Sequence, residues 1–309
     1  MILTDAQLPD GRRADVTLAD GRIQAIDPAG AVAVAPGVER HDCAGALLLP
    51  ALVEGHVHLD KTLMGLPFMP HLPGDSVAER IAREKEQKRR LDMAIRPPAA
   101  ALLAREIACG TTALRTHVDI DTEVRLNGLH QILALRAELA DLIDIQIVAF
   151  PQSGIHADPG TADLLDAALS AGADLVGGLD PAGIDGDIAG HLDTVFGLAG
   201  RHGKGVDLHL HDRGTLGQFE LSEIAARTRA AGLADRVTVS HAFALGDPGD
   251  GGAVLDAMAE AAVAIMTSGP GPVAVPPIGQ LRAAGVRVFA GNDNIRDAWS
   301  PYGDGDMLA

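Results

Sequence analysis

The segment Pro50-Ala51-Leu52-Val53-Glu54-Gly55-His56-Val57-His58-Leu59-Asp60-Lys61 is the most informative stretch of this 309-residue sequence. The apolar run at 47–53 predicts a buried strand that leads into the two histidines. Strand side chains repeat on one face every second residue, so His56 and His58 are expected to face the same way. Imidazole is the commonest protein ligand for zinc and also suits iron. Taken alone, the pair is equally consistent with two hydrogen-bonded core histidines.

Seven further apolar runs follow the first one, at 112–118, 144–150, 174–179, 205–210, 236–241, 262–267 and 286–291. Helical segments separate them, at 76–92, 97–110, 124–140, 161–171, 190–201, 218–231, 252–260 and 276–284. Eight such units predict an α/β protein with a (β/α)8 TIM-type barrel. A doubly wound open sheet is the alternative. It would need a glycine-rich phosphate loop after its first strand, and 53–58 is not one.

The first part of the chain has a different pattern. Short apolar runs flank Asp20-Gly21, which is typical of a β-hairpin. We therefore expect a small β module at 1–46 and the barrel at 47–309.

The charge balance excludes several classes of protein. Lys and Arg number 25 and Asp and Glu 42, so the net charge is −17. This acidic balance argues against nucleic-acid binding and against a basic membrane-surface protein. No apolar run approaches the roughly 18 residues of a membrane span, and no secretory signal is visible. Two cysteines cannot form a disulfide framework, so a cytoplasmic protein is expected.

Polar residues gather where the predicted strands end. Six of the twelve histidines lie there: His56, His58, His117, His209, His211 and His241. The same ends carry Asp119, Gln152, Asp180, Asp212, Asp293 and Asn294. The carboxyl ends of barrel strands meet at one face, where active sites form. The pattern therefore predicts a metal site at this face.

Some roles follow from the residue types. His209 is the better candidate ligand of the His209-x-His211 pair, which leaves His211 for the substrate or for proton transfer. His241 is a candidate general acid or base, or a buried structural histidine. Asp293 is a candidate ligand and proton acceptor, or a helix N-cap. Lys61 could face the pocket.

The four lysines help to define the site. None of them lies at the end of the strand at 174–179, which favours one metal ion over a pair bridged by a carbamylated lysine. Lys85 and Lys88 are expected on a solvated helix face. Other catalytic templates are missing from the sequence, which has no nucleophile elbow, no Walker loop and no Cys-x-x-Cys.

From residue 45 onward the chain resembles the amidohydrolase superfamily, in particular its cytosine deaminase branch. The resemblance is carried by 50–62, 115–119, 145–154 and 239–241. Cytosine deaminases carry glutamate where this chain has Asp212, and threonine where it has Lys61. They also carry paired aspartates where this chain has Asp293-Asn294. In these positions the sequence is more similar to the s-triazine hydrolases of the branch.

The resemblance implies hydrolysis of an exocyclic C–N bond in an aminopyrimidine or s-triazine by metal-activated water. Cytosine deaminase proper and an inactive heterocycle-binding homologue are the alternatives. The same resemblance implies one divalent ion, zinc or iron, held by His56, His58, His209 and Asp293. Catalytic roles fall to His241, His211, Asp293 and Lys61, and substrate contacts to Gln152, Asp180 and Asn294.

The resemblance also bears on partners and on the length of the chain. The implied partner is a small heterocycle, with neither nucleic acid nor membrane, and self-association is implied as well. Members of the family usually continue past the aspartate of the eighth strand and return strands to the N-terminal module. We therefore expect a partial chain or an incomplete β module.

Overall fold

The structure is a computed structural model that describes residues 1–33, 35–70, 74–91, 94–247, 251–269 and 274–308. The chain forms two compact units, Met1–Ala51 and Leu52–Ala309. Within the described residues, no helix combines the length and the apolar character that crossing a membrane requires.

The first unit is a small mixed sheet of order β3-β2-β1-β4. Its strands are β1 (Ile2–Gln7), β2 (Arg13–Ala19), β3 (Arg22–Pro28) and β4 (Arg40–Asp42). The predicted hairpin is confirmed, because β2 and β3 pair antiparallel around Asp20-Gly21. Both turn residues have positive φ, 52° and 68°, as a type I′ turn requires.

The second unit confirms the predicted barrel. Eight strands hydrogen-bond in strict sequence order, and every described pairing is parallel. They are β5 (Leu52–Val57), β6 (Thr111–Asp119), β7 (Asp144–Phe150), β8 (Leu175–Leu179), β9 (Gly205–Leu210), β10 (Val237–His241), β11 (Ala264–Thr267) and β12 (Val288–Ala290).

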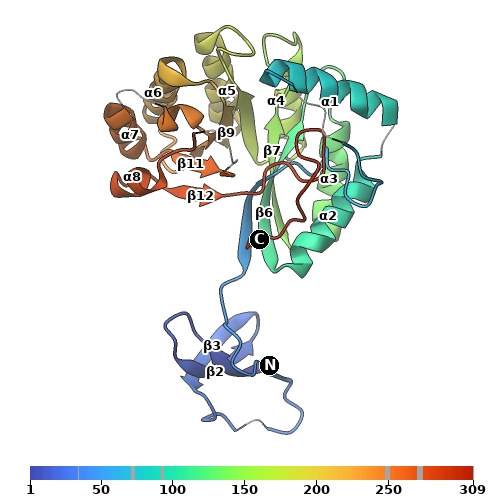
Figure 1. Ribbon diagram of the computed structural model, residues 1–309, viewed down its shortest axis with the longest axis vertical. Coiled ribbons are helices and arrows are strands. Elements are labelled where there is room, and N and C mark those ends of the chain that lie inside the picture. Colours follow the sequence, from blue (N-terminus) through green and yellow to red (C-terminus); the bar gives the residue numbers. More distant parts are fainter. Residues whose placement is uncertain (34, 71–73, 92–93, 248–250, 270–273, 309) are drawn as a thin grey trace. The chain divides into compact units, whose positions relative to one another are not determined.

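At least one helix lies between each two consecutive strands of the barrel, and two lie between β5 and β6 (Figure 1). The helices are α1 (Val77–Leu91), α2 (Arg96–Ala108), α3 (Asn127–Glu138), α4 (Thr161–Ala171), α5 (Ile188–His202), α6 (Gly214–Ala230), α7 (Gly251–Glu260) and α8 (Ile278–Ala283). A capping serine precedes α1, where Ser76 Oγ accepts a hydrogen bond of 3.2 Å from the Glu79 amide.

The barrel nearly closes between its first and last strands. The amide of Asp293 donates to the carbonyl of His56 over 2.7 Å, and Val57 and Asp293 form a parallel bridge. A Cβ at Gly55 would lie 2.4 Å from the carbonyl oxygen of Ala290, so only glycine permits this approach. The closure brings the first histidine pair next to Asp293.

The first barrel strand lies later than the sequence predicted. The apolar run 47–53 was expected to be the strand, but β5 begins at Leu52. Leu47 instead bridges to Gln7, and the Leu48 amide donates to the Gln7 carbonyl over 2.8 Å. Pro50 has no amide to donate to a ladder. His56 therefore lies inside the strand rather than after it.

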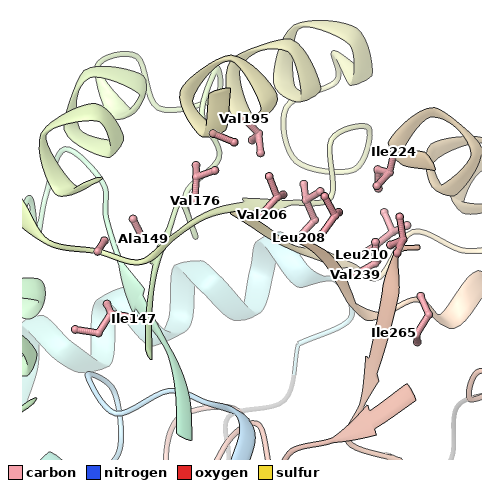
Figure 2. Close-up of a cluster of buried hydrophobic side chains, with 14 of the residues drawn as sticks. Ile147, Ala149, Val176, Val195, Val206, Leu208, Leu210, Ile224, Val239 and Ile265 are labelled. Carbon is pink, nitrogen blue, oxygen red and sulfur yellow. The ribbon is translucent and has the colours of Figure 1, made fainter. Parts of the chain in front are cut away.

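The core lies between strands and helices. On β9, Val206, Leu208 and Leu210 belong to an apolar cluster with Val195 of α5 and Ile224 of α6 (Figure 2). Side chains alternate along a strand, so Asp207 and His209 occupy the opposite face, toward the barrel interior. The same strand thus supplies both core and site.

Candidate metal centre

The six histidines predicted at the strand ends gather at one place. Each ring centroid lies within 4.6 Å of another in the set, or within 5.2 Å for His58: His56, His58, His117, His209, His211 and His241. All except His211 are buried. Imidazoles that lie on β5, β6, β9 and β10 or directly after β5 and β9 thus form one cluster.

Four donor atoms converge within that cluster. His58 Nε2 lies 3.4 Å from His209 Nε2 and 3.3 Å from Asp293 Oδ1. His56 Nε2 lies 3.5 Å from the same carboxylate oxygen. The three histidines also offer ligand atoms that lie within 4.8 Å of one another. The predicted ligand residues His56, His58, His209 and Asp293 are therefore close enough to share one ion.

The donor set fits a divalent cation. Ligands of one tetrahedral zinc ion, each about 2.0–2.2 Å from it, lie about 3.3–3.6 Å apart. Among the described residues, His56 Nε2 is buried with no hydrogen-bond partner. Such an orphaned nitrogen is costly unless something binds its lone pair.

The electrostatics agree with this assignment. Burial, followed by the charge of Lys61, lowers the pKa of His58 to about 4. Burial and the neighbouring His117 hold the pKa of His209 well below its usual value. Burial would raise the pKa of Asp293, but His241, His56 and His58 hold it well below its ordinary range. Neutral imidazoles and an ionised carboxylate are the forms that bind a cation.

A second layer of residues orients His56. Its Nδ1 lies 3.0 Å from Ser240 Oγ, which donates to Asp207 Oδ1 over 2.8 Å. Arg115 donates to the other oxygen of Asp207 over 2.6 Å. Because the serine proton goes to Asp207, the serine oxygen accepts from His56 Nδ1–H, and Nε2 keeps its lone pair for an ion. Asp207 and Ser240 were not predicted from the sequence, although Asp207 shares a strand face with His209.

His241 reaches the cluster through an unusual backbone conformation. His241 and Ala242 have left-handed φ angles of 73° and 46°. This turn ends β10 and allows consecutive residues, Ser240 and His241, both to contact the centre. The His241 Nε2 lies 4.0 Å from Asp293 Oδ2, and its ring stacks on His211 with centroids 4.5 Å apart. A strained backbone of this kind is common at functional sites.

A cavity of about 580 Å³ opens beside the histidines. Polar members of its wall include the predicted residues Lys61, Gln152, His211, His241 and Asn294. Ile81, Leu179, Phe243 and Trp299 supply apolar surface. A larger hollow of about 730 Å³ includes the amino ends of β10 and β11, and no histidine lines it.

Asp180 and Asn294, which were predicted to bind the substrate, form hydrogen bonds with other residues of the site. Asp180 accepts hydrogen bonds from the amide and from Nδ1 of His211, the latter over 2.9 Å, and does not line the cavity. Asn294 does line it, and its Nδ2 donates to Asp293 Oδ1 over 2.9 Å. Asp212 accepts from the Gly183 amide over 2.9 Å and is absent from the cavity wall.

The expectation for the lysines of α1 was wrong. Lys88 lies 2.6 Å from the buried Glu84 and 2.9 Å from Asp119, and Lys85 lies 2.8 Å from Asp121. These lysines face the barrel because α1 covers its mouth. Glu84 and Trp299 are further residues of this region that the sequence analysis missed, since neither follows a barrel strand directly.

The comparisons with known proteins agree with this geometry. Residues 39–309 match the family described as "Amidohydrolase family". The N-isopropylammelide isopropyl amidohydrolase of Pseudomonas sp. strain ADP is 33% identical over 273 residues, which are 86% of this chain and 68% of that protein.

Two solved structures are similar over the whole chain. N-isopropylammelide isopropylaminohydrolase from Burkholderia multivorans gives a TM-score of 0.94 at 44% identity, covering 99% of this chain and 78% of that one. The 5-methylcytosine deaminase of Klebsiella pneumoniae, liganded with phosphonocytosine, gives 0.84 at 30% identity, covering 100% and 79%. The barrel, the convergent His and Asp donors and these matches confirm the resemblance, and the chain belongs to the amidohydrolase family.

Proposed function

We propose that this protein is a metal-dependent hydrolase that cleaves an exocyclic C–N bond of a nitrogen heterocycle and releases ammonia or an alkylamine. The observation that carries the proposal is the convergence of His56, His58, His209 and Asp293 beside a cavity of about 580 Å³. Relatives named for N-isopropylammelide support an s-triazine as the substrate.

These four residues would hold the cation, and we expect zinc. A divalent ion bound there would supply a nucleophilic water of lowered pKa and Lewis acidity toward the substrate. We assign proton acceptance to Asp293, because its Oδ2 lies on the side of His241 while Oδ1 faces His56 and His58. His241 would stabilise the charge that develops during attack.

We assign the return of a proton to the leaving amine to His211. Asp180 accepts from its Nδ1, so its Nε2 is the nitrogen available to the cavity. In this proposal Asp180 orients His211, where the sequence analysis had it bind substrate. The ammonium of Lys61 also lies at the cavity wall, and it would stabilise negative charge on the ring.

The cavity wall suits a small heterocycle with an alkyl substituent. Gln152 and Asn294 offer amide groups to a ring edge. Ile81, Leu179 and Phe243 offer apolar surface to an N-alkyl group.

Deamination of a cytosine-type ring is the second candidate. The 30% identity to 5-methylcytosine deaminase favours it. Asp212, which stands where cytosine deaminases carry a glutamate, bonds to the Gly183 amide away from the cavity and does not support it.

The test is metal analysis and amine release on the same zinc-loaded sample. N-isopropylammelide, cytosine and 5-methylcytosine are compared for wild type, His56→Ala and Asp293→Ala. The matched control is His130→Ala, which removes an exposed histidine of α3. We expect isopropylamine release from the triazine, lost with the metal in both site variants and retained in the control.

The possible outcomes separate the candidates. Ammonia release from a pyrimidine alone would favour the cytosine-type deaminase. Stoichiometric metal without turnover of any ring would favour an inactive binding homologue. Full metal content and unchanged turnover in both site variants would contradict the proposed site.

A further inference from the structure

Glu84 of α1 joins several groups that line the cavity without lining it itself. Its side chain is buried, with 2% exposure. The carboxylate accepts hydrogen bonds from Gln152 Nε2 over 2.8 Å and from Trp299 Nε1, and it lies 2.6 Å from Lys88 Nζ. A buried carboxylate with this many donors is held in one place.

The first consequence concerns the amide of Gln152. Its oxygen accepts from Lys61 Nζ, and its nitrogen donates to Glu84. A flipped amide would turn its N–H groups toward the lysine ammonium and its oxygen toward the carboxylate, and both contacts would be repulsive. Glu84 and Lys61 therefore select a single orientation.

The second consequence concerns Lys61. Four charged side chains form a closed ring of alternating sign. Lys61 lies 2.9 Å from Asp119, Asp119 lies 2.9 Å from Lys88, Lys88 lies 2.6 Å from Glu84, and Glu84 lies 3.8 Å from Lys61. Without Glu84, two ammonium groups would share Asp119. The ring therefore fixes the ammonium of Lys61 at the cavity wall.

The third consequence concerns Trp299, the single tryptophan of the chain. Its indole N–H donates to Glu84, and the guanidinium of Arg80 lies over its ring, 5.8 Å from the centroid. Arg80 and Glu84 are four residues apart and so share one face of α1. Trp299 also lines the cavity, so one carboxylate holds two parts of its wall.

We propose that Glu84 is a positioning residue for substrate recognition, which holds Gln152, Lys61 and Trp299 in the arrangement that the substrate ring meets. The proposal rests on the proposed function, because it takes the ring to occupy this cavity. With one N–H of Gln152 given to Glu84, the groups left free on Gln152 and Lys61 include N–H donors. This wall therefore suits a ring edge that carries acceptors, such as carbonyl oxygens or unprotonated ring nitrogens.

The test compares Glu84→Gln with Glu86→Gln, the same change at an exposed position of the same helix. Trp299 gives a readout that needs no turnover, because selective excitation reports this residue alone. We expect E84Q to shift the emission and to increase quenching by acrylamide, and E86Q to match wild type. Unchanged emission and quenching in a folded E84Q would overturn the proposal.

Kinetics with N-isopropylammelide supply the second readout. In E84Q we expect KM to rise at least about tenfold and kcat to fall by less than that, since Gln152 and Trp299 contact the bound ring while the candidate ligands are unchanged, and any fall in kcat reports the displacement of Lys61. In a Gln152→Ala background E84Q should raise KM much less, because the amide that Glu84 positions is already absent. An equal rise in KM in both backgrounds would show that Glu84 does not act through Gln152.

A second variant covers a failure of E84Q to fold. Glu84→Asp keeps the charge for Lys88 and withdraws the carboxylate from Gln152 and Trp299 by one methylene. We expect the same emission change and the same rise in KM, and wild-type behaviour in both would overturn the proposal. If wild type binds the triazine, measured by quenching of Trp299, but turns nothing over, the proposed function fails while weaker binding by E84D would still support the positioning role.

Discussion

At the scale of single residues, the site depends on what holds each imidazole. His56 is the clearest case, because Ser240 and Asp207 fix the nitrogen that faces away from the ligand cluster. Partners of this kind usually change metal affinity by 10–100-fold when they are removed (about 1.4–2.7 kcal/mol). The hydroxyl of Ser240 is therefore expected to affect metal affinity although Ser240 does not line the cavity.

Replacing Ser240 by alanine should weaken zinc binding by about 10–100-fold, because His56 loses the group that sets its tautomer. Competition with a chromophoric chelator measures this directly. Ser222→Ala is the matched control, since Ser222 Oγ donates to the Gln218 carbonyl of its own helix, α6, over 3.0 Å. Equal zinc affinity in the two variants would show that Ser240 does not orient His56.

At the scale of elements, Asp185 ties the loop after β7 to α5. Its carboxylate accepts from the amides of Ile155, His156 and Ala157 and from His191 Nδ1, the last over 2.6 Å. Burial alone would raise the pKa of Asp185, but the hydrogen bonds from His191 and from these amides lower it to about 2. The loop thus depends on an ionised carboxylate.

Asp185→Asn should loosen this loop and lower stability by about 1–3 kcal/mol, because three amides and His191 lose a charged acceptor. Hydrogen exchange at residues 155–157 should speed up, and Asp187→Asn should leave it unchanged, since asparagine also caps a helix.

The same substitution should change the acid stability of the protein. The pKa of Asp185 is lower in the folded protein than its unfolded value of 3.8, so its ionised carboxylate stabilises the fold above that pH, and this contribution is lost as pH falls toward 2. The variant should therefore lose less stability than wild type between about pH 4 and 2. A parallel decline in acid unfolding would contradict this.

At the scale of the barrel, the candidate ligands come from its first, middle and last strands. His56 and His58 belong to or follow β5, His209 lies on β9, and Asp293 follows β12. An ion bound by all of them would cross-link the two strands at which the barrel closes. Metal binding should therefore be coupled to stability.

Zinc at 100 times its Kd should add about 2.7 kcal/mol to the free energy of unfolding. For a chain of this size we expect Tm to rise by about 5 °C. Calorimetry with and without zinc measures the shift, which His130→Ala should keep and His56→Ala should lose. A Tm that does not respond to zinc in wild type would argue against a site made by these strands.

The sequence by itself determined the barrel and predicted the four candidate ligands, whose binding of an ion stays a prediction. Period-two and helical patterns are local, so the succession of strands and helices and the shared face of His56 and His58 could be predicted from neighbouring residues alone. The first strand was misplaced at 47–53, because Leu47 pairs with Gln7, and a run of apolar residues does not reveal its partner. The turn that brings His241 beside Ser240 was likewise invisible in the pattern.

Only the tertiary structure decided what surrounds the ligands. Ser240 and Asp207 are 33 residues apart, and Trp299 and Glu84 are 215 apart. Asp180 was predicted to bind the substrate, but both of its carboxylate oxygens accept hydrogen bonds from His211. Such contacts exist only after the barrel closes and α1 covers its mouth. The face of a strand to which a side chain points follows from local geometry, whereas the partner of a buried polar group depends on where the rest of the chain has packed.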